Sequence, residues 1–238
     1  MSGNFKVEVM VSSKPTNAGF TLIELLIVIA ITAVLAAIAL PKMERMIASQ
    51  RINNRAEQML ALFQFARAEA IRANKPVLIC PTTIRKNTTD SNGCQNFTAY
   101  NEGKGWQGFL AFIDNDINGE YAAATDSSVR VVALNQNTDD INKIKVKLKW
   151  QNYKADQSTY HDNIADGNKL GFLPNGQFGF GKGANGWTIG QSNLVMEVSD
   201  SKNPNISRRV VITPSGKPVL CQNGTTNTTN SFCTVQLP

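Results

Sequence analysis

Histidine is almost absent from this chain, and cysteine is scarce. The 238 residues include one histidine, His161, and four cysteines. So few imidazole and thiol groups argue against a zinc site, an iron–sulfur cluster or acid–base catalysis by histidine. His161 lies in a polar segment, residues 160–163, which offers it no catalytic partner. We therefore predict that the protein is not an enzyme and needs no metal or cofactor.

The remaining composition is typical of a globular chain. Hydrophobic residues make up 42% of the sequence, with 17 glycines and 9 prolines, which fits neither a fibrous nor a disordered protein. The formal net charge is +6. That excess of positive charge permits an anionic partner without requiring one.

One long apolar run, residues 20–40, separates a polar N-terminus from the rest of the chain. Eighteen of its 21 residues are apolar, and only Thr21, Glu24 and Thr32 interrupt it. As a helix it would be about 31 Å long, which matches a hydrocarbon core of about 30 Å. Ala18 and Gly19 precede the run, whereas the cleavage site of a secretory signal follows it. We expect this helix to stay in the mature protein and to cross a membrane.

The cysteines indicate on which side the C-terminal region lies, because basic residues flank both ends of the apolar run and leave the charge rule ambiguous. All four cysteines follow the run, and disulfides would need an oxidising compartment such as a bacterial periplasm. Three pairings are possible. We favour Cys80–Cys94 and Cys221–Cys233, since each closes a short polar loop; four buried free thiols are the alternative.

The helix is expected to continue beyond the membrane. Residues 42–73 contain no proline or glycine, and apolar side chains recur at spacings of four and three: Ile52, Ala56, Met59, Phe63, Ala66, Ala70 and Ala73. This stripe predicts a face that packs on the protein's own sheet. Pro76 ends the helix near residue 74. A helix over residues 20–74 would be about 80 Å long.

After residue 76 the pattern changes to short extended runs between turns rich in glycine, asparagine and aspartate. We predict strands near residues 77–80, 109–113, 129–134, 143–150, 170–173, 177–180, 194–198, 208–213 and 217–220. The predicted fold class is α+β, with a long N-terminal helix packed on a C-terminal antiparallel sheet domain.

Glu24 is the unusual residue of the apolar run. A carboxylate near the centre of a bilayer costs about 2.5–3.5 kcal/mol and usually has a partner. If the chain is cut after Gly19, Glu24 lies one helical turn from the new α-amino group of Phe20. It could then pair with that amine or with the amine of a neighbouring copy. A glutamate that reaches the membrane interface is the alternative.

The segment from Gly19 to Glu24, GFTLIE, resembles the class III signal of type IV pilins and type II secretion pseudopilins. The resemblance implies that a prepilin peptidase cuts between Gly19 and Phe20 and methylates the new N-terminal Phe20. It also implies that Glu24 neutralises this amine on an adjacent subunit during assembly. Pro41 matches the proline around which the helix of that family loosens in the filament.

Within the C-terminal region, residues 106–119 are similar to the GspH/FimT group, as are the turn segments 170–176 and 211–217. The resemblance implies a pilin fold with four parts: a leader peptide (1–19), a transmembrane and assembly helix (20–41), an amphipathic second half of the helix (42–74) and a periplasmic β-rich domain (75–238). It implies a single-pass inner-membrane protein that moves to the pilus tip at the cell surface. Its partners would be other major and minor pilins and the prepilin peptidase.

The expected function is that of a minor type IV pilin, which primes or caps the pilus at its tip and so serves pilus biogenesis, twitching motility and adhesion. Two alternatives stay open: a minor pseudopilin of type II secretion, and a DNA-binding competence pilin for DNA uptake.

An acidic motif after the second predicted strand mimics half of a calcium-binding loop. Asp114, Asp116, Asn118 and Gly119 have the alternating oxygen ligands and the glycine bend, but Thr125 stands where a bidentate acid is needed. We interpret the motif as a turn stabilised by aspartate and asparagine side chains. Asn-x-Ser/Thr sequences mark surface loops at Asn87, Asn96, Asn205, Asn223 and Asn227.

A basic strand is the remaining candidate site. Lysine alternates with apolar residues, which places four ammonium groups about 6.8 Å apart on one face of a strand: Lys143, Lys145, Lys147 and Lys149. This spacing is close to that of successive phosphates along a nucleic-acid strand, so DNA contact is an alternative. We favour protection of an exposed strand from aggregation. Arg208 and Arg209 are the nearest match to the G-R-x-R segment of DNA-uptake members, and they depart from it.

Overall fold

The computed structural model describes residues 19–82, 93–95, 97, 108–135, 143–152, 161–162, 169–181, 187–190, 192–221 and 233. The described chain contains one helix, α1 (Leu22–Ala73), followed only by strands. These are β1 (Val77–Thr82), β2 (Gly108–Ile113), β3 (Ser127–Ala133), β4 (Ile144–Asn152), β5 (His161–Asp162), β6 (Lys169–Phe172), β7 (Phe178–Gly181), β8 (Thr188–Ile189), β9 (Ser192–Asp200), β10 (Ser207–Ile212) and β11 (Pro218–Cys221). The structure confirms the predicted α+β class.

The chain divides into two compact units, Met1–Arg45 and Met46–Pro238. The described part of the first unit is the N-terminal half of α1, whose side chains are all exposed. The second unit, called the body here, contains the C-terminal half of α1 and every strand.

The C-terminal half of α1 buries a single stripe of side chains. The buried residues are Ala48, Ile52, Ala56, Met59, Leu62, Phe63, Ala66 and Ala70. The predicted stripe is therefore correct from Ile52 to Ala70, whereas Ala73 is only half-buried, because the helix ends there. Asn74 follows with φ 52°, the left-handed conformation in which many helices end, and Pro76 prevents further helix.

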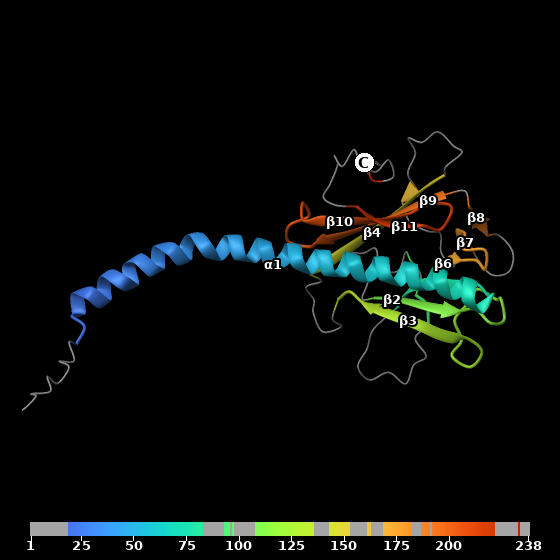
Figure 1. Ribbon diagram of the computed structural model, residues 1–238, viewed down its shortest axis with the longest axis horizontal. Coiled ribbons are helices and arrows are strands. Elements are labelled where there is room, and N and C mark those ends of the chain that lie inside the picture. The colour runs from blue at the N-terminus through green and yellow to red at the C-terminus, as the bar shows by residue number, and fades with distance from the viewer. Residues whose placement is uncertain are drawn as a thin grey trace, which may run out of the picture. The chain divides into compact units, whose positions relative to one another are not determined.

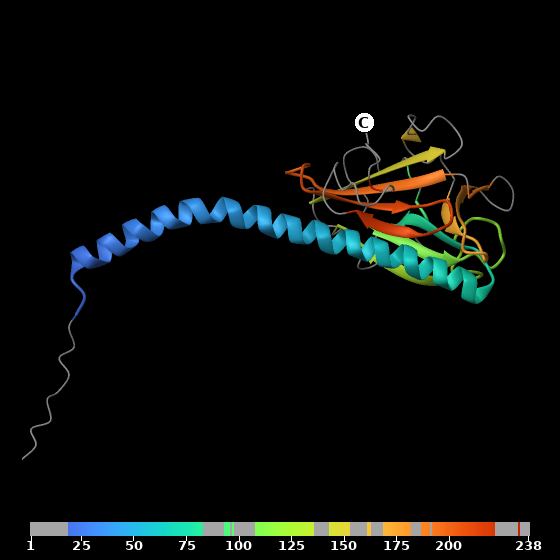
Figure 2. The same ribbon diagram turned by 45° about the horizontal axis from the view of Figure 1, so that its top comes forward.

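The strands form two antiparallel sheets. The six-stranded sheet has the order β3-β2-β1-β6-β7-β8, and the five-stranded sheet has the order β11-β10-β9-β4-β5. Figure 1 shows β2 and β3 on one side of the C-terminal half of α1, and β9 and β10 on the other. Figure 2 shows the five-stranded sheet more openly, with yellow β4 beside orange β9.

One core joins the helix stripe to the inner faces of both sheets. It includes Phe63 of α1, Phe109 of β2 and Met196 of β9, all fully buried. Each sheet also has a small apolar cluster on its outer face. Cys80 belongs to the outer cluster of the six-stranded sheet, and Cys221 to that of the five-stranded sheet.

Both disulfides that the short loops favour are present in the structure. Cys80 is bonded to Cys94, with Cα atoms 5.3 Å apart, and Cys221 to Cys233, with Cα atoms 5.6 Å apart. Cys94 and Cys233 pack against the outer apolar clusters of the two sheets.

Two hairpin turns, one from each sheet, lie against each other at the C-terminal end of α1. A Cβ atom on Gly216, in the β10–β11 turn, would lie 2.0 Å from the carbonyl oxygen of Gly176, in the β6–β7 turn. Arg67 of α1 donates hydrogen bonds to the carbonyl oxygens of Gly176 (3.1 Å) and Ser215 (3.3 Å). The guanidinium group thereby ties the helix to both sheets.

All nine predicted strands are present, with ends shifted by up to two residues. Two strands were not predicted, β5 and β8, each of two residues, which is too short for any periodicity. His161 therefore belongs to a strand and not to a loop: it pairs with Trp150 of β4. Several features of the sequence lie outside the described residues, namely positions 1–18 of the leader, Trp106 and the sequences at Asn87, Asn96, Asn223 and Asn227.

Candidate functional site

The predicted cleavage pair precedes the first helical residue. Gly19, Phe20 and Thr21 are non-helical, and Phe20 is 85% exposed. A Cβ atom added to Gly19 would meet no atom within 4 Å. The peptide bond between Gly19 and Phe20 is thus in an open, non-helical segment, which is the form of chain that a peptidase can accommodate.

Glu24 occupies the first turn of α1, and its backbone contributes to the helix cap. The Glu24 amide donates to Thr21 Oγ1 (3.3 Å), and the Leu25 amide donates to the Thr21 carbonyl (3.2 Å). Thr21 is therefore the N-cap residue, and a Thr followed three residues later by Glu is the capping-box order. A negatively charged carboxylate at the N-terminal end of a helix also interacts favourably with the positive end of the helix dipole. The sequence analysis missed this capping role of Thr21, although the Thr21–Glu24 spacing indicates it.

The N-terminal half of α1 presents apolar side chains in every direction. An 18-residue window has a mean hydropathy of 2.8, and none of it is buried. By length and composition this helix can cross a membrane. The hydroxyl of Thr32 bonds back to the Val28 carbonyl (2.9 Å), so it adds little polarity. Glu24 is the single charged residue between Leu22 and Pro41, through which the helix continues.

On the five-stranded sheet, three of the predicted lysines form an exposed row. Lys143, Lys145 and Lys147 are exposed on the outer face, while the alternating Ile144, Val146 and Leu148 are buried in the core. We call Lys143, Lys145 and Lys147 the lysine row. Because Lys143 precedes β4 and the other two lie within it, the row follows the first half of the strand.

Lys149 and Arg208 do not belong to this exposed face, contrary to the prediction. Lys149 is only 9% exposed because it stands opposite Val195, a member of the apolar cluster that Cys221 and Cys233 cover. Arg208 is opposite Val198, a core residue, so it projects to the other face of the sheet from Arg209. Arg209 faces outward and pairs with Glu197 at 2.9 Å.

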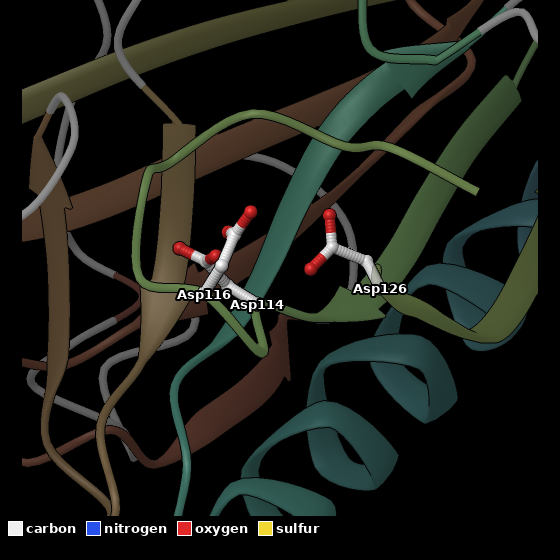
Figure 3. A group of neighbouring side chains, drawn as sticks. All are labelled: Asp114, Asp116 and Asp126. Carbon is white, nitrogen blue, oxygen red and sulfur yellow. The ribbon is translucent and has the colours of Figure 1, made fainter. Parts of the chain in front are cut away.

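The acidic motif brings three carboxylates together. Oxygen atoms of Asp114, Asp116 and Asp126 lie within 4.8 Å of one another. Figure 3 shows Asp126, which precedes β3, with its carboxylate facing those of Asp114 and Asp116 after β2. Oxygen ligands at these distances could hold a hard cation such as Ca²⁺.

These carboxylates accept hydrogen bonds from backbone amides of the same loop. Asp114 accepts the amides of Asn118 (3.2 Å) and Gly119 (2.9 Å), and Asp126 accepts those of Asn115 (2.9 Å) and Ala122 (2.8 Å). Burial raises the pKa of Asp114, although the amide of Gly119 opposes the increase. The arrangement fits the interpretation of the motif as a turn built on aspartate side chains.

The comparisons identify both regions of the chain. Residues 14–40 match the model of the prokaryotic N-terminal methylation motif, and residues 55–216 match the model of type II transport protein GspH. A solved structure of the type IV minor pilin FimU from Pseudomonas aeruginosa strain PAO1 aligns over 71% of this chain and 92% of its own, with 14% identity and a TM-score of 0.32. No curated protein matches. The GspH model spans more than half of the sequence, and the chain therefore belongs to the GspH family of type IV pilin-like proteins.

Proposed function

We propose that this protein is a minor type IV pilin that enters the filament at or near its tip. Its helix anchors it in the inner membrane, with the body in the periplasm, until a prepilin peptidase cuts between Gly19 and Phe20 and methylates Phe20. Sister helices of other pilins then replace the lipid around the helix. The contribution to the cell is assembly of the filament and, through it, twitching motility and adhesion.

One observation supports this proposal most directly: a fully exposed apolar half-helix with a single carboxylate in its first turn. Burial of the apolar surface against other helices supplies packing energy but sets no register, since leucine and isoleucine side chains recur along the helix. A charge in an apolar environment is costly without a partner. The Glu24 carboxylate therefore fixes the register at which it meets the α-amino group of an adjacent subunit.

Both disulfides support a periplasmic body, because such bonds form and persist in oxidising compartments. Pro41 lies inside α1 and has no amide hydrogen, so the helical hydrogen bond at that position is missing. The helix is weakest there, and we propose Pro41 as the point at which it loosens in the filament.

The experiment that tests the register is Glu24→Gln, with Glu44→Gln as the matched control. Both glutamates are exposed on α1, but Glu44 follows the apolar run. The variants are expressed in a host strain that lacks its own copy of the gene. Mass spectrometry of the membrane fraction reports cleavage and methylation, and immunoblots of sheared filaments report incorporation. We expect Glu24→Gln to be processed normally but depleted at least tenfold from filaments.

Glu44→Gln is expected to incorporate like the wild type. Equal incorporation of Glu24→Gln would overturn the proposed role of the carboxylate. Gly19→Leu tests processing separately: the structure has free space at Gly19, so an unprocessed Gly19→Leu chain would report a requirement of the peptidase and not a folding defect.

A minor pseudopilin of type II secretion is the second candidate, and the match to the GspH model favours it. Deletion of the gene separates the two functions. Loss of surface filaments and twitching with intact protein secretion supports the pilin. Accumulation of exported proteins in the periplasm with intact twitching supports the pseudopilin.

A further inference from the structure

We propose that the outer face of the five-stranded sheet is a nucleic-acid-binding surface, and that the lysine row contacts successive phosphates. This surface lies on the body and is independent of the role proposed for the helix. It differs from the predicted set of contacts, because Lys149 and Arg208 are excluded from it.

The geometry of the row is regular. Alternation along a strand places Lys143, Lys145 and Lys147 on one face with about 6.8 Å between neighbours. All three side chains are exposed, and the strand beneath them is fixed by its pairing with β9 over its full nine residues. Lys145 and Lys147 therefore stand on a paired strand, and Lys143 directly precedes it, where its carbonyl accepts a hydrogen bond from the Ser201 amide. Positive charges at a fixed spacing are complementary to a nucleic-acid strand, which has one negative phosphate per nucleotide.

These lysines differ from most other cations of the body, which have partners. Arg51 pairs with Asp200 (3.5 Å), Lys169 with Glu120 (3.4 Å) and Lys75 with the side chain of Asn115 (2.8 Å). In the described part of the chain, no hydrogen bond or ion pair engages the side chains of the lysine row. Their charge is available to a ligand.

Among the residues that the structure describes, the surroundings of the row do not neutralise it. On the neighbouring strand β9, Lys145 stands opposite Ser199 and Lys147 opposite Glu197. Glu197 is the one acid on this part of β9, and its carboxylate is bound to Arg209 with only 17% of the side chain exposed. Lys202 adds an exposed cation in the β9–β10 turn, whose Ser201 amide bonds to the Lys143 carbonyl (3.0 Å).

Protection of a strand edge explains the row less well. The side chain of Asn135 already satisfies the backbone of Ile144, with bonds of 2.9 and 3.1 Å, and β5 pairs with Lys149 and Trp150. The longest edge strand in the described sheets is β3, Ser127–Ala133, and it contains no lysine. Residues 145–148 of β4 have no strand partner on that side among the described residues, so the free edge beside the row is shorter than the edge of β3, whose one cation is Arg130.

The chemistry of the row indicates how the ligand is bound. Lysine acts on phosphate as a point charge and reads no base, so binding should be independent of sequence. Each phosphate that is neutralised releases counterions, and the affinity for duplex DNA should fall with salt by a slope of about 0.9 per contact. With three contacts, the logarithm of the affinity should fall against the logarithm of the salt concentration with a slope of about 2.7.

The test uses the full mature chain in a nonionic detergent and a fluorescent 30-base-pair duplex of arbitrary sequence. Fluorescence anisotropy is measured from 50 to 200 mM salt for the wild type, the single glutamine variants of the row and the triple variant Lys143→Gln/Lys145→Gln/Lys147→Gln. Lys217→Gln is the matched control, because Lys217 is an exposed lysine in the β10–β11 turn, outside the surface. Tryptophan fluorescence and disulfide content verify that each variant is folded.

We expect each single variant to lower the salt slope by about 0.9 and the triple variant to lose at least tenfold in affinity at 50 mM salt. Lys217→Gln should bind like the wild type. Equal losses for Lys217→Gln and the row variants, or no binding by the wild type at 50 mM salt, would overturn the proposal. Poly-glutamate that competes as well as DNA at equal charge would also overturn it, and would indicate a general polyanion surface. Tighter binding to vesicles of anionic lipid than to the duplex would overturn it in favour of a membrane surface.

Discussion

The two halves of α1 differ in apolar content and in surroundings: the first half is almost wholly apolar and exposed, and the second half is amphipathic and packed in the body. In the first half, large side chains such as Leu26 and Leu35 are more than half exposed and surround the helix. In the second half, residues such as Met59 and Leu62 form one fully buried stripe, and the other faces are mainly polar, although Phe65 and Ile71 are exposed there. A helix that is apolar on all sides needs lipid or other helices around it, whereas a helix with one apolar stripe can bury that stripe in the core of its own domain.

The difference shows where each half obtains its stability. The second half is held by the core of its own body, so its side chains contribute to unfolding of the single chain. No side chain of the first half is buried by the described part of the chain, so this half depends on what surrounds it. The same substitution should therefore have different effects in the two halves.

The largest expected effect comes from leucine-to-alanine substitutions, one in each half. Leu62→Ala empties a fully buried position and should lower the free energy of unfolding of the body by about 2–5 kcal/mol. Leu35→Ala removes the same atoms from an exposed position and should change that free energy by less than about 0.5 kcal/mol. Denaturant unfolding of the full chain in detergent, followed by tryptophan fluorescence, measures both.

In filaments the order of these two variants should reverse at equal expression. Leu35→Ala weakens helix packing between subunits, so it should be depleted from sheared filaments although its body is intact. A destabilised body in Leu35→Ala, or an unaffected one in Leu62→Ala, would contradict the division of α1 into two environments.

A smaller effect sharpens the comparison within the second half. Arg67→Met keeps an unbranched side chain but removes the bonds to the Gly176 and Ser215 carbonyls. Hydrogen bonds that involve a charged group contribute about 1.5–3 kcal/mol, and we expect a loss of unfolding free energy in that range. Arg55→Met is the control, because the bond of Arg55 in the described part of the chain is to Gln58 on the exposed helix surface, a contact of about 0.2–0.5 kcal/mol. Equal losses for the two variants in denaturant unfolding would show that the link between the turns is unimportant.

Most of the fold could be predicted because it follows from local patterns. The stripe from Ile52 to Ala70 has helical spacing, and the strands lie between turn residues, so both leave a clear periodic signal. The contact between the two hairpin turns could not be predicted. Nothing in the sequence near Gly216 indicates that Gly176, forty residues earlier in another sheet, leaves it no room for a side chain.

Prediction of the candidate sites had the same limit, since a local pattern does not show which distant residues cover a side chain. Alternation placed Lys149 correctly on the outer face, but exposure depends on what covers that face, and the cluster of Val195, Val211 and Cys221 is assembled from three strands. Likewise, the neighbours Arg208 and Arg209 look like one basic pair in the sequence although a strand sends them to opposite faces. The Thr21 cap needs no such information, because its bond to the Glu24 amide lies within one helical turn.

The smallest effect concerns a glutamate of the second half. Glu69, near the end of α1, accepts hydrogen bonds from Arg72, which lower its pKa below the usual value. A lowered pKa in the folded state stabilises the protein above the ordinary glutamate pKa, and this stabilisation is lost as the pH falls through the lowered value. Glu69→Gln should therefore unfold slightly more easily than the wild type at pH 7, and the difference should be smaller at pH 3, because the stabilisation is lost as the pH falls through the lowered pKa. Thermal unfolding at both pH values measures it, with the exposed Glu57→Gln as control. A difference that persists unchanged at pH 3 would mean that Glu69 stabilises the helix through packing and not through its charge.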